Sequence, residues 1–272
     1  MALDRLALLL AQITIAAGGP VSSVYARRCS TRWKLDGSPV TEADLAAERL
    51  ILERLGKAFP WVPVVAEESV ADGYRPKLGP RFILVDPLNG TREFIAGRRE
   101  FTVNIAMVED GRPVAGAIYA PLLEQGWFGV TASYTLSATP GPDAGDLTSA
   151  RRIRVRVPPD TGVVALVSRS NPDPATEAYL SRMQLIERRP MGSSLKFCRI
   201  AEGQADIYPR LGGIREWDIA AGYAILQAAG GIMTAPNGAP LLYGASAGDF
   251  RRPGSVASGG FSLADTGPPV NA

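Results

Sequence analysis

Acidic side chains stand at three widely separated places in the sequence where a strand is expected to end or a helix to begin. Glu67 follows the apolar run 62–66, Asp86 follows the apolar run 82–85, and Asp218 opens an apolar stretch with helical periodicity. The segment that starts at Asp86, Asp-Pro-Leu-Asn-Gly-Thr, adds a glycine turn and a hydroxyl. Carboxylates gathered in this way hold hard divalent cations, which can bind a phosphate and activate a water molecule. The pattern therefore indicates metal-assisted phosphate chemistry.

The sequence contains no histidine, and this limits the chemistry that it can perform. Serine–histidine triads, histidine-based phosphatases and zinc sites built on histidine are excluded. The two cysteines, Cys29 and Cys198, have neither a metal-ligand spacing nor enough partners for a disulfide framework. We expect them to be free thiols of a cytoplasmic protein. Carboxylates and hydroxyls must therefore carry out any catalysis.

The composition is that of an ordinary globular protein of 272 residues, with 46% hydrophobic and 21% charged residues. The formal net charge is +2 and no basic run stands out, so nothing favours a nucleic-acid partner. The apolar stretch 6–17 is similar to a signal-peptide core, but Gln12 and Thr14 interrupt it. Its leucines recur at helical spacing, which predicts an amphipathic helix over residues 3–17 that ends at Gly18-Gly19-Pro20. We therefore expect a soluble fold without a membrane partner.

The rest of the chain divides into two regions. Turn-length gaps between strands across residues 101–131 predict an antiparallel meander, and residues 137–150 are the best candidate for a boundary loop. We predict two interlocked halves with a cleft between them: residues 1–145, an α+β half that carries most candidate metal ligands, and residues 146–272, an α/β half. The predicted strands are 62–66, 82–85, 101–108, 114–119, 127–131, 162–167, 184–188, 205–208 and 231–234, and the later helices are 42–58, 174–183, one from Ser193, and 218–229.

Each motif also has a purely structural explanation. Thr41 with Asp44 three residues later is the pattern of a capping box. Ser193 opens a predicted helix, where serine is a common cap. Glu67 and Glu68 are typical of a solvated loop start, and the Asp-Pro-Leu-Asn-Gly-Thr segment is typical of a turn. Taken singly, each motif favours the structural explanation. Their combination in this order favours a shared site in which Glu67 faces inward and Glu68 has a lesser role.

As an ordered set, these motifs resemble the inositol monophosphatase superfamily of magnesium-dependent, lithium-sensitive phosphatases. Within it, the chain is most similar to the bacterial 3'(2'),5'-bisphosphate nucleotidases. The resemblance covers nearly the whole chain and fades near 132–160 and at the last few residues. It implies a layered α/β sandwich of the inositol monophosphatase/fructose-1,6-bisphosphatase type, often assembled as a homodimer. The matching segments are 34–44, 65–68, 85–94, 100–106, 192–198, 201–208 and 216–218.

The resemblance also implies roles for individual residues. Glu67, Asp86 and the carbonyl of Leu88 would hold one Mg²⁺, and Asp86, Asn89 and Asp218 a second; the carboxylates could hold two or three ions with a phosphate. Thr91, supported by Asp44, would orient and deprotonate a metal-bound water. The phosphate would rest on the backbone of Leu88, Asn89, Gly90 and Thr91. From the residues themselves, the alternative to a simple cap at Gly192, Ser193 and Ser194 is that the free amides and hydroxyls of this helix start receive an anion.

Asn89 departs from the family pattern, which usually has aspartate at this position. An amide oxygen can ligate Mg²⁺ but contributes no negative charge. We therefore expect the second ion to bind more weakly here than in relatives. Because of the same departure, an alternative function is that of a catalytically weak regulator that binds a nucleotide or phosphate.

Substrate choice depends on basic residues beside the motifs. Lys34, Lys196 and Arg210 suit a substrate with a second phosphate. Arg210 occupies a place where inositol-specific relatives tend to carry an acid. This favours a bisphosphorylated nucleotide such as 3'-phosphoadenosine 5'-phosphate over the alternative, an inositol or sugar phosphate. The expected partner is a small phosphorylated metabolite.

Overall fold

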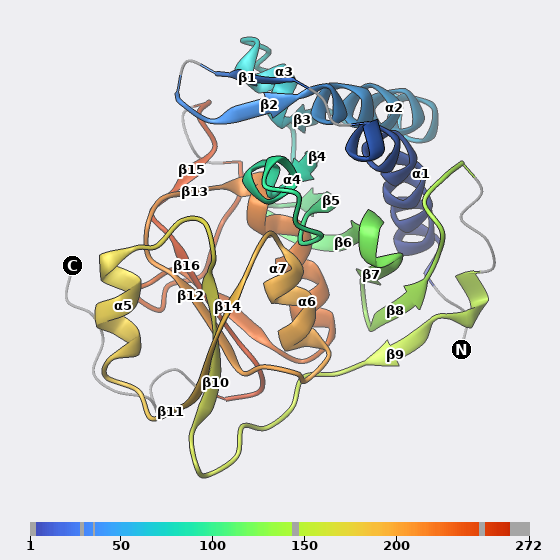
Figure 1. Ribbon diagram of the computed structural model, residues 1–272. Helices are drawn as coiled ribbons and strands as arrows, with labels where there is room; N and C mark the ends of the chain where they lie inside the picture. The colour runs from blue at the N-terminus through green and yellow to red at the C-terminus, as the bar shows by residue number, and fades with distance from the viewer. Residues whose placement is uncertain (1–3, 28–29, 35, 143–146, 245–247, 262–272) are drawn as a thin grey trace.

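The structure is a computed structural model that describes residues 4–27, 30–34, 36–142, 147–244 and 248–261. In this part of the chain, two β-sheets alternate with three layers of helices (Figure 1). The arrangement confirms the predicted layered α/β sandwich. Cys198 is buried and free, as expected, whereas Cys29 lies outside the described residues.

The larger sheet has seven strands, which follow one another in chain order from β3 to β9. β3 and β4 are parallel and all later neighbours are antiparallel, which confirms the meander predicted for residues 101–131. β8 and β9 extend the sheet beyond the strands that the sequence predicts. The strands are β3 (Val64–Ala66), β4 (Arg81–Asn89), β5 (Thr102–Glu109), β6 (Arg112–Ala120), β7 (Gln125–Gly129), β8 (Ser133–Ser137) and β9 (Arg151–Ile153).

The smaller sheet has five strands in the order β11-β10-β12-β16-β14. β10 runs parallel to β11 and β12, whereas β16 is antiparallel to β12 and β14. Two short pairs, β1-β2 and β13-β15, lie outside the main sheets. The strands are β10 (Val163–Ser168), β11 (Leu185–Met191), β12 (Ile207–Arg210), β14 (Ile232–Thr234), β16 (Ser255–Ser258), β1 (Thr31–Trp33), β2 (Pro39–Thr41), β13 (Ile214–Arg215) and β15 (Arg251–Arg252).

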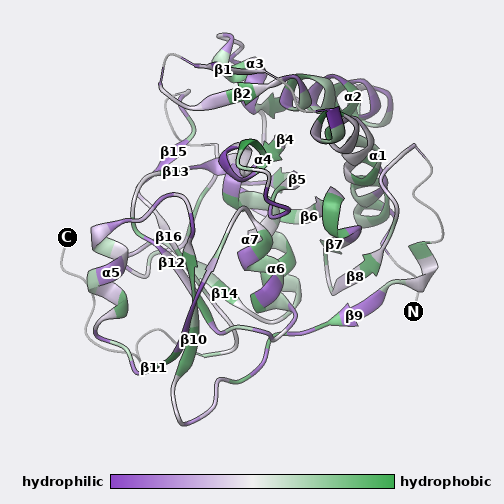
Figure 2. Cartoon of the chain, in the orientation of Figure 1, coloured by the Kyte–Doolittle hydropathy of each residue, from purple (hydrophilic) through white to green (hydrophobic). Residues whose placement is uncertain are grey.

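Alternate residues of the strands face different helical layers, as a period of two requires. On β4, Ile83 and Val85 pack with α1 and α2, whereas Phe82 and Leu84 share a core with α6 and α7. α5 covers the outer face of the smaller sheet. Figure 2 shows apolar residues along β4 and β10, which lie inside the two sheets. The helices are α1 (Arg5–Arg27), α2 (Glu42–Ala58), α3 (Glu67–Ala71), α4 (Thr91–Ile95), α5 (Pro174–Leu180), α6 (Leu195–Ala201) and α7 (Glu216–Ala228), with 3₁₀ turns at Pro121–Leu123 and Leu147–Ser149.

The first helix is longer than predicted. The prediction that it ends at Gly18-Gly19-Pro20 is wrong, because α1 continues through these residues to Arg27. A Cβ at Gly18 would lie 2.5 Å from the Tyr119 ring, so this glycine permits a close approach to the sheet. Burial of the helix beyond it, including Val21, offsets the backbone hydrogen bond lost at Pro20. Of the described helices, only α1 is long and apolar enough to span a membrane. In the fold, 61% of an apolar stretch of 18 residues within this helix is buried.

The two predicted halves share a core. α7 lies in the second half of the chain, yet it packs against strands of the first sheet: a Cβ at Gly116 on β6 would lie 2.5 Å from the carbonyl oxygen of Ala221. Within the predicted boundary loop 137–150, the Gly141 amide donates to the Ile15 carbonyl at 3.2 Å. Residues 143–146 lie outside the described residues, so the boundary after residue 145 stays a prediction.

The contact between α6 and α7 generates a stability prediction. A Cβ at Gly222 would lie 2.3 Å from the Phe197 ring, so Gly222→Ala forces two core helices apart and is expected to lower the free energy of unfolding by about 1–3 kcal/mol. Gly56→Ala, in an exposed part of α2 with open space around the added carbon, is the control and is expected to gain about 0.5–1 kcal/mol. Urea unfolding measures both. Equal stability of the Gly222 variant and the native protein would contradict this packing.

Candidate active site

The end of β4 delivers Asp86 to the centre of the molecule. Asp86 is fully buried and lies opposite Asn104 on β5, and the pairing of the two strands becomes irregular after it. Gly90 then adopts a φ of 95°, in the left-handed region that glycine favours, and α4 begins at Thr91. The Asp-Pro-Leu-Asn-Gly-Thr segment is therefore both a turn and the floor of a cleft.

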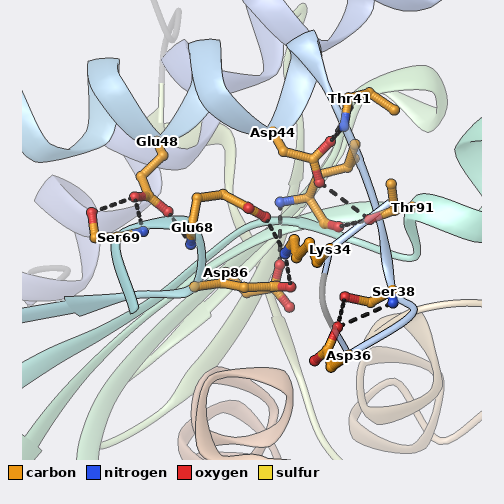
Figure 3. Close-up of polar contacts among 12 residues, drawn as sticks. Lys34, Asp36, Ser38, Thr41, Asp44, Glu48, Glu68, Ser69, Asp86 and Thr91 are labelled. Atoms are coloured by element: carbon orange, nitrogen blue, oxygen red, sulfur yellow. Dashed lines mark hydrogen bonds and ion pairs between the residues drawn. The ribbon is translucent and has the colours of Figure 1, made fainter. Parts of the chain in front are cut away.

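Asp44 caps a helix and also contacts Thr91, a residue that lines the cleft. Its Oδ2 accepts hydrogen bonds from the Thr41 amide (2.8 Å) and hydroxyl (2.6 Å), which completes the predicted capping box of α2. Its other oxygen, Oδ1, lies 3.2 Å from the Thr91 hydroxyl (Figure 3). Burial raises the pKa of Asp44 to about 6. The Thr91 hydroxyl also lies 3.1 Å from the Leu88 carbonyl, so its single proton has two acceptors.

Lys34 joins the two adjacent glutamates. Its Nζ donates to Glu67 at 2.7 Å. It also donates to Glu68 at 2.7 Å (Figure 3). Burial disfavours the charged amine, but the two carboxylates outweigh burial and raise the pKa of Lys34. Glu67 lines the cleft and Glu68 is buried beside it. The expectation that Lys34 suits a second phosphate is not met, because its ammonium binds the glutamates instead.

Glu48 fixes the start of α3, and the sequence analysis missed it. Its carboxylate accepts from the Glu68 amide (2.8 Å) and from the Ser69 amide (2.8 Å) and hydroxyl (2.6 Å) (Figure 3). It thereby satisfies amide groups that the first turn of a helix leaves free. Glu48 lies one helical turn after Asp44, on the same side of α2, and this spacing was the signal that could have revealed it.

Asp218 comes from α7 and completes the cluster. Its Oδ2 accepts from the Arg215 amide at 2.9 Å, as a cap would, and its Oδ1 lies 3.2 Å from Nδ2 of Asn89. The same Nδ2 donates to Asp86 at 2.7 Å. Burial raises the pKa of Asp218 to about 6, and the charge of Glu67 adds to the effect. Burial also raises the pKa of Asp86, together with the charges of Glu67 and Asp218.

The donor set fits a hard divalent cation. Glu67, Asp86, the Leu88 segment and Asp218 line one cavity of about 360 Å³, and they offer only oxygen ligands. Like charges crowded around Asp86 are also the environment that a cation stabilises. Among the described residues, no three acidic or cysteine side chains already meet in the arrangement of a metal centre. Lys34 and the Asn89 amide instead lie between the carboxylates.

The other end of the cavity is basic. Lys196 is buried, its Nζ donates to the carbonyls of Met191 (3.1 Å) and Ser193 (2.7 Å), and it lies 4.8 Å from the centre of the Tyr208 ring. Burial lowers the pKa of Lys196 to about 7. Arg210 donates to the Asn171 carbonyl at 2.7 Å. The cavity also contains cleft residues that the sequence analysis did not select: Arg92, Glu93, Ser168, Asn171 and Arg215.

The segment 192–194 joins the two ends of the cavity. The Gly192 amide donates to Glu100 at 2.8 Å, and a Cβ at this position would lie 2.6 Å from the Glu93 side chain. Ser194 is buried and donates toward the Asp218 carbonyl (2.8 Å) and Asn89 Oδ1 (3.2 Å). The structure therefore brings together all the predicted site residues from both halves of the chain, although their roles stay predictions.

A layered sandwich with a carboxylate-lined cleft at the end of a buried strand defines a class of metal-dependent phosphatases. A model described as the inositol monophosphatase family matches residues 3–259. The chain belongs to this family, which confirms the resemblance seen in the sequence.

Individual relatives narrow the comparison. The chain is 40% identical to the 3'(2'),5'-bisphosphate nucleotidase CysQ of Salmonella typhimurium over 221 residues, 80% of this chain and 86% of the relative. It is 37% identical to CysQ of Escherichia coli strain K12 over 234 residues, 85% and 91% of the two chains. The crystal structure of CysQ from Bacteroides thetaiotaomicron has a TM-score of 0.78 and 32% identity, covering 94% of this chain and 98% of that one. The inositol monophosphatase of Thermotoga maritima has a TM-score of 0.74 and 26% identity. The match covers 95% of this chain and 93% of that one.

The support that Glu48 gives to α3 can be tested by unfolding. Glu48→Gln is expected to lower the free energy of unfolding by about 1–3 kcal/mol, because it replaces an acceptor of three hydrogen bonds with a group that brings two donors into the same space. Glu53→Gln, on the exposed side of the same helix, is the control and should leave the urea midpoint unchanged. If the two variants have the same midpoint, Glu48 does not hold α3 in place.

Proposed function

We propose that the protein is a Mg²⁺-dependent phosphomonoesterase that hydrolyses the 3'-phosphate of 3'-phosphoadenosine 5'-phosphate, releasing AMP and phosphate. The observation that supports this most strongly is the single cavity with a carboxylate end and a basic end. A substrate with two phosphates matches both ends, because one phosphate needs cations to approach the carboxylates and the other meets Lys196 and Arg210. The names of the CysQ relatives support the same substrate class.

Magnesium would neutralise the scissile phosphate and lower the pKa of a water molecule. Glu67, Asp86 and the Leu88 carbonyl would hold the first ion, and Asp218 would bring a ligand for a second, more weakly bound ion from the other half of the chain. The backbone of residues 88–91 and the segment 192–194 would hold the phosphate oxygens. Glu68 would keep Lys34 in place beside the metal ligands rather than bind a cation itself.

Thr91 and Asp44 would move the proton of the attacking water. The Thr91 hydroxyl accepts a proton from the water and passes its own to Asp44 Oδ1, which the hydrogen bond of 3.2 Å already places within reach. Asp44 suits this role because a pKa of about 6 leaves it mostly ionised at neutral pH, while making it a stronger base than an ordinary aspartate. The departing 3'-oxygen takes its proton from water, since the chain has no histidine to act as an acid.

Two alternatives have distinct signatures. An inositol or sugar monophosphatase would use the same carboxylates without the basic end, and relatives with that activity share the fold. A regulator that binds a nucleotide or phosphate would keep the basic end and lose catalysis. The paired Asp44 and Thr91 favour an enzyme, because a binding protein needs no group to activate water. A cytoplasmic homodimer, with no nucleic-acid partner, remains part of the proposal.

The decisive experiment compares phosphate release from 3'-phosphoadenosine 5'-phosphate and from inositol 1-phosphate across a magnesium titration. We expect strong preference for the nucleotide. Asp44→Asn and Thr91→Val should each lower kcat by about 10²-fold or more, because they remove the path of the proton. Asp160→Asn, an exposed acid elsewhere, is the control. Preference for inositol phosphate would support an inositol or sugar monophosphatase. Release of phosphate from neither substrate would support a regulator that binds a nucleotide or phosphate.

The basic end predicts a pH dependence of KM. Glu93, Glu100, Arg169 and Arg210 surround Lys196, and burial dominates their effects, so Lys196 is protonated below about pH 7 and loses its charge above it. KM for 3'-phosphoadenosine 5'-phosphate should therefore rise with pH above 7.

Lys196→Gln tests this dependence. The variant should raise KM for the nucleotide about tenfold at low pH and remove the pH dependence, because it deletes a charge-assisted hydrogen bond. Lys57→Gln, on the exposed surface of α2, should change neither. An unchanged KM in the Lys196 variant would remove Lys196 from the substrate site.

A further inference from the structure

Asn89 lies between two carboxylates that come from distant parts of the chain. Asp86 ends β4 and Asp218 lies in the first turn of α7. Asn89 Nδ2 is 2.7 Å from Oδ2 of Asp86 and 3.2 Å from Oδ1 of Asp218. An amide nitrogen carries two hydrogens, so both are used by these carboxylates. The amide therefore bridges the two acids as a double donor.

The opposite end of the same amide is also held. Its Oδ1 lies 3.2 Å from the hydroxyl of Ser194, which is buried. Ser194 in turn accepts from Asn104 Nδ2 at 2.9 Å and lies 2.8 Å from the Asp218 carbonyl. The Ser194 hydroxyl has one proton for two acceptors, Asn89 Oδ1 and the nearer Asp218 carbonyl, so the orientation of the amide depends chiefly on its two hydrogen bonds to the carboxylates.

This orientation has a direct consequence for cations. An ion shared by Asp86 and Asp218 needs an oxygen ligand at residue 89, yet the atom that faces the two carboxylates is a nitrogen with two hydrogens. For the ion to bind there, both hydrogen bonds must break and the amide must turn over. No carboxylate charge at residue 89 compensates for this loss. The residues present therefore do not fit a second strongly bound cation.

We propose that the amide of Asn89 takes the place of the second cation, so that this chain binds one divalent ion tightly, at Glu67, Asp86 and the Leu88 carbonyl. Two donated hydrogen bonds hold Asp86 and Asp218 together, as the shared ion of the family pattern would. The inference rests on the proposed function for the position of the first ion. It also gives Asn89 a structural role in place of the ligand role that the resemblance implies.

The test counts bound ions without substrate. Mn²⁺ is titrated into the full-length protein and followed by electron paramagnetic resonance, for the native chain and for Asn89→Asp. We expect the native chain to bind one Mn²⁺ tightly and the variant to bind one more at the same free concentration, because the variant supplies a third carboxylate and no bridging donor. Asn237→Asp adds the same charge at an exposed turn and should bind like the native chain.

Thermal unfolding gives a second readout. Without divalent ions, Asn89→Asp should melt below the native protein, because three acids then face one another with no donor between them. Added Mn²⁺ should raise the melting temperature of the variant more than that of the native chain, since a ligand that binds only the folded state stabilises it. The control Asn237→Asp should follow the native chain in both conditions.

Each outcome separates this inference from the proposed function when phosphate release is measured on the same samples. A native chain that binds two ions as tightly as Asn89→Asp, or none, overturns the inference even if it hydrolyses the nucleotide. A native chain that binds one ion and releases no phosphate supports the inference and contradicts the proposed function.

Discussion

The crowding of carboxylates at one point inside the molecule governs the structure around it. Glu67, Asp86 and Asp218 line one cavity, with Asp86 fully buried and the other two partly buried, and such a group is unstable unless positive charge or donated hydrogens balance it. The protein supplies part of this balance itself, through the ammonium of Lys34 and the amide of Asn89. The remainder is available to a cation. The unbalanced negative charge of the carboxylates lowers the stability of the protein. The same charge gives the site its affinity for a cation and, through the cation, for a phosphate.

The layered fold is the means by which the acids are brought together. β4 lies inside the larger sheet and carries Asp86 to the middle of the molecule, while α7 packs between the sheets and brings Asp218 from the other half of the chain. Glycines at Gly116 and Gly222 allow α7 to approach β6 and α6 closely. A small change in these contacts would move Asp218 relative to Asp86. The contacts that stabilise the central layer of helices therefore also set the distance between Asp218 and Asp86.

The sequence predicted the local patterns and most residues that line the cleft, but not the contacts that some of these residues make with distant parts of the chain. The meander, α2 and the capping box at Asp44 follow from periodicity and spacing within short segments, and all are present. The end of α1 was wrong because a glycine signals a stop locally but here permits contact with Tyr119, a residue far along the chain. Lys34 was predicted to suit a second phosphate, yet its ammonium binds Glu67 and Glu68, which the sequence alone did not indicate. Glu48 was missed although its spacing from Asp44 on α2 pointed to it, because its partners at the start of α3 lie farther along the chain.

The burial of α1 also affects how the chain must fold as it is made. This helix is apolar enough to resemble a membrane span, and the surface that covers it comes from α2 and from β5, β6 and β7, the last of which ends at Gly129. During synthesis α2 follows the helix closely, but the part of its apolar face that packs on the sheet stays uncovered until the meander has emerged. In that interval, the uncovered apolar surface makes the nascent chain prone to aggregation. The time that the meander needs to close is therefore the time during which the chain carries this liability.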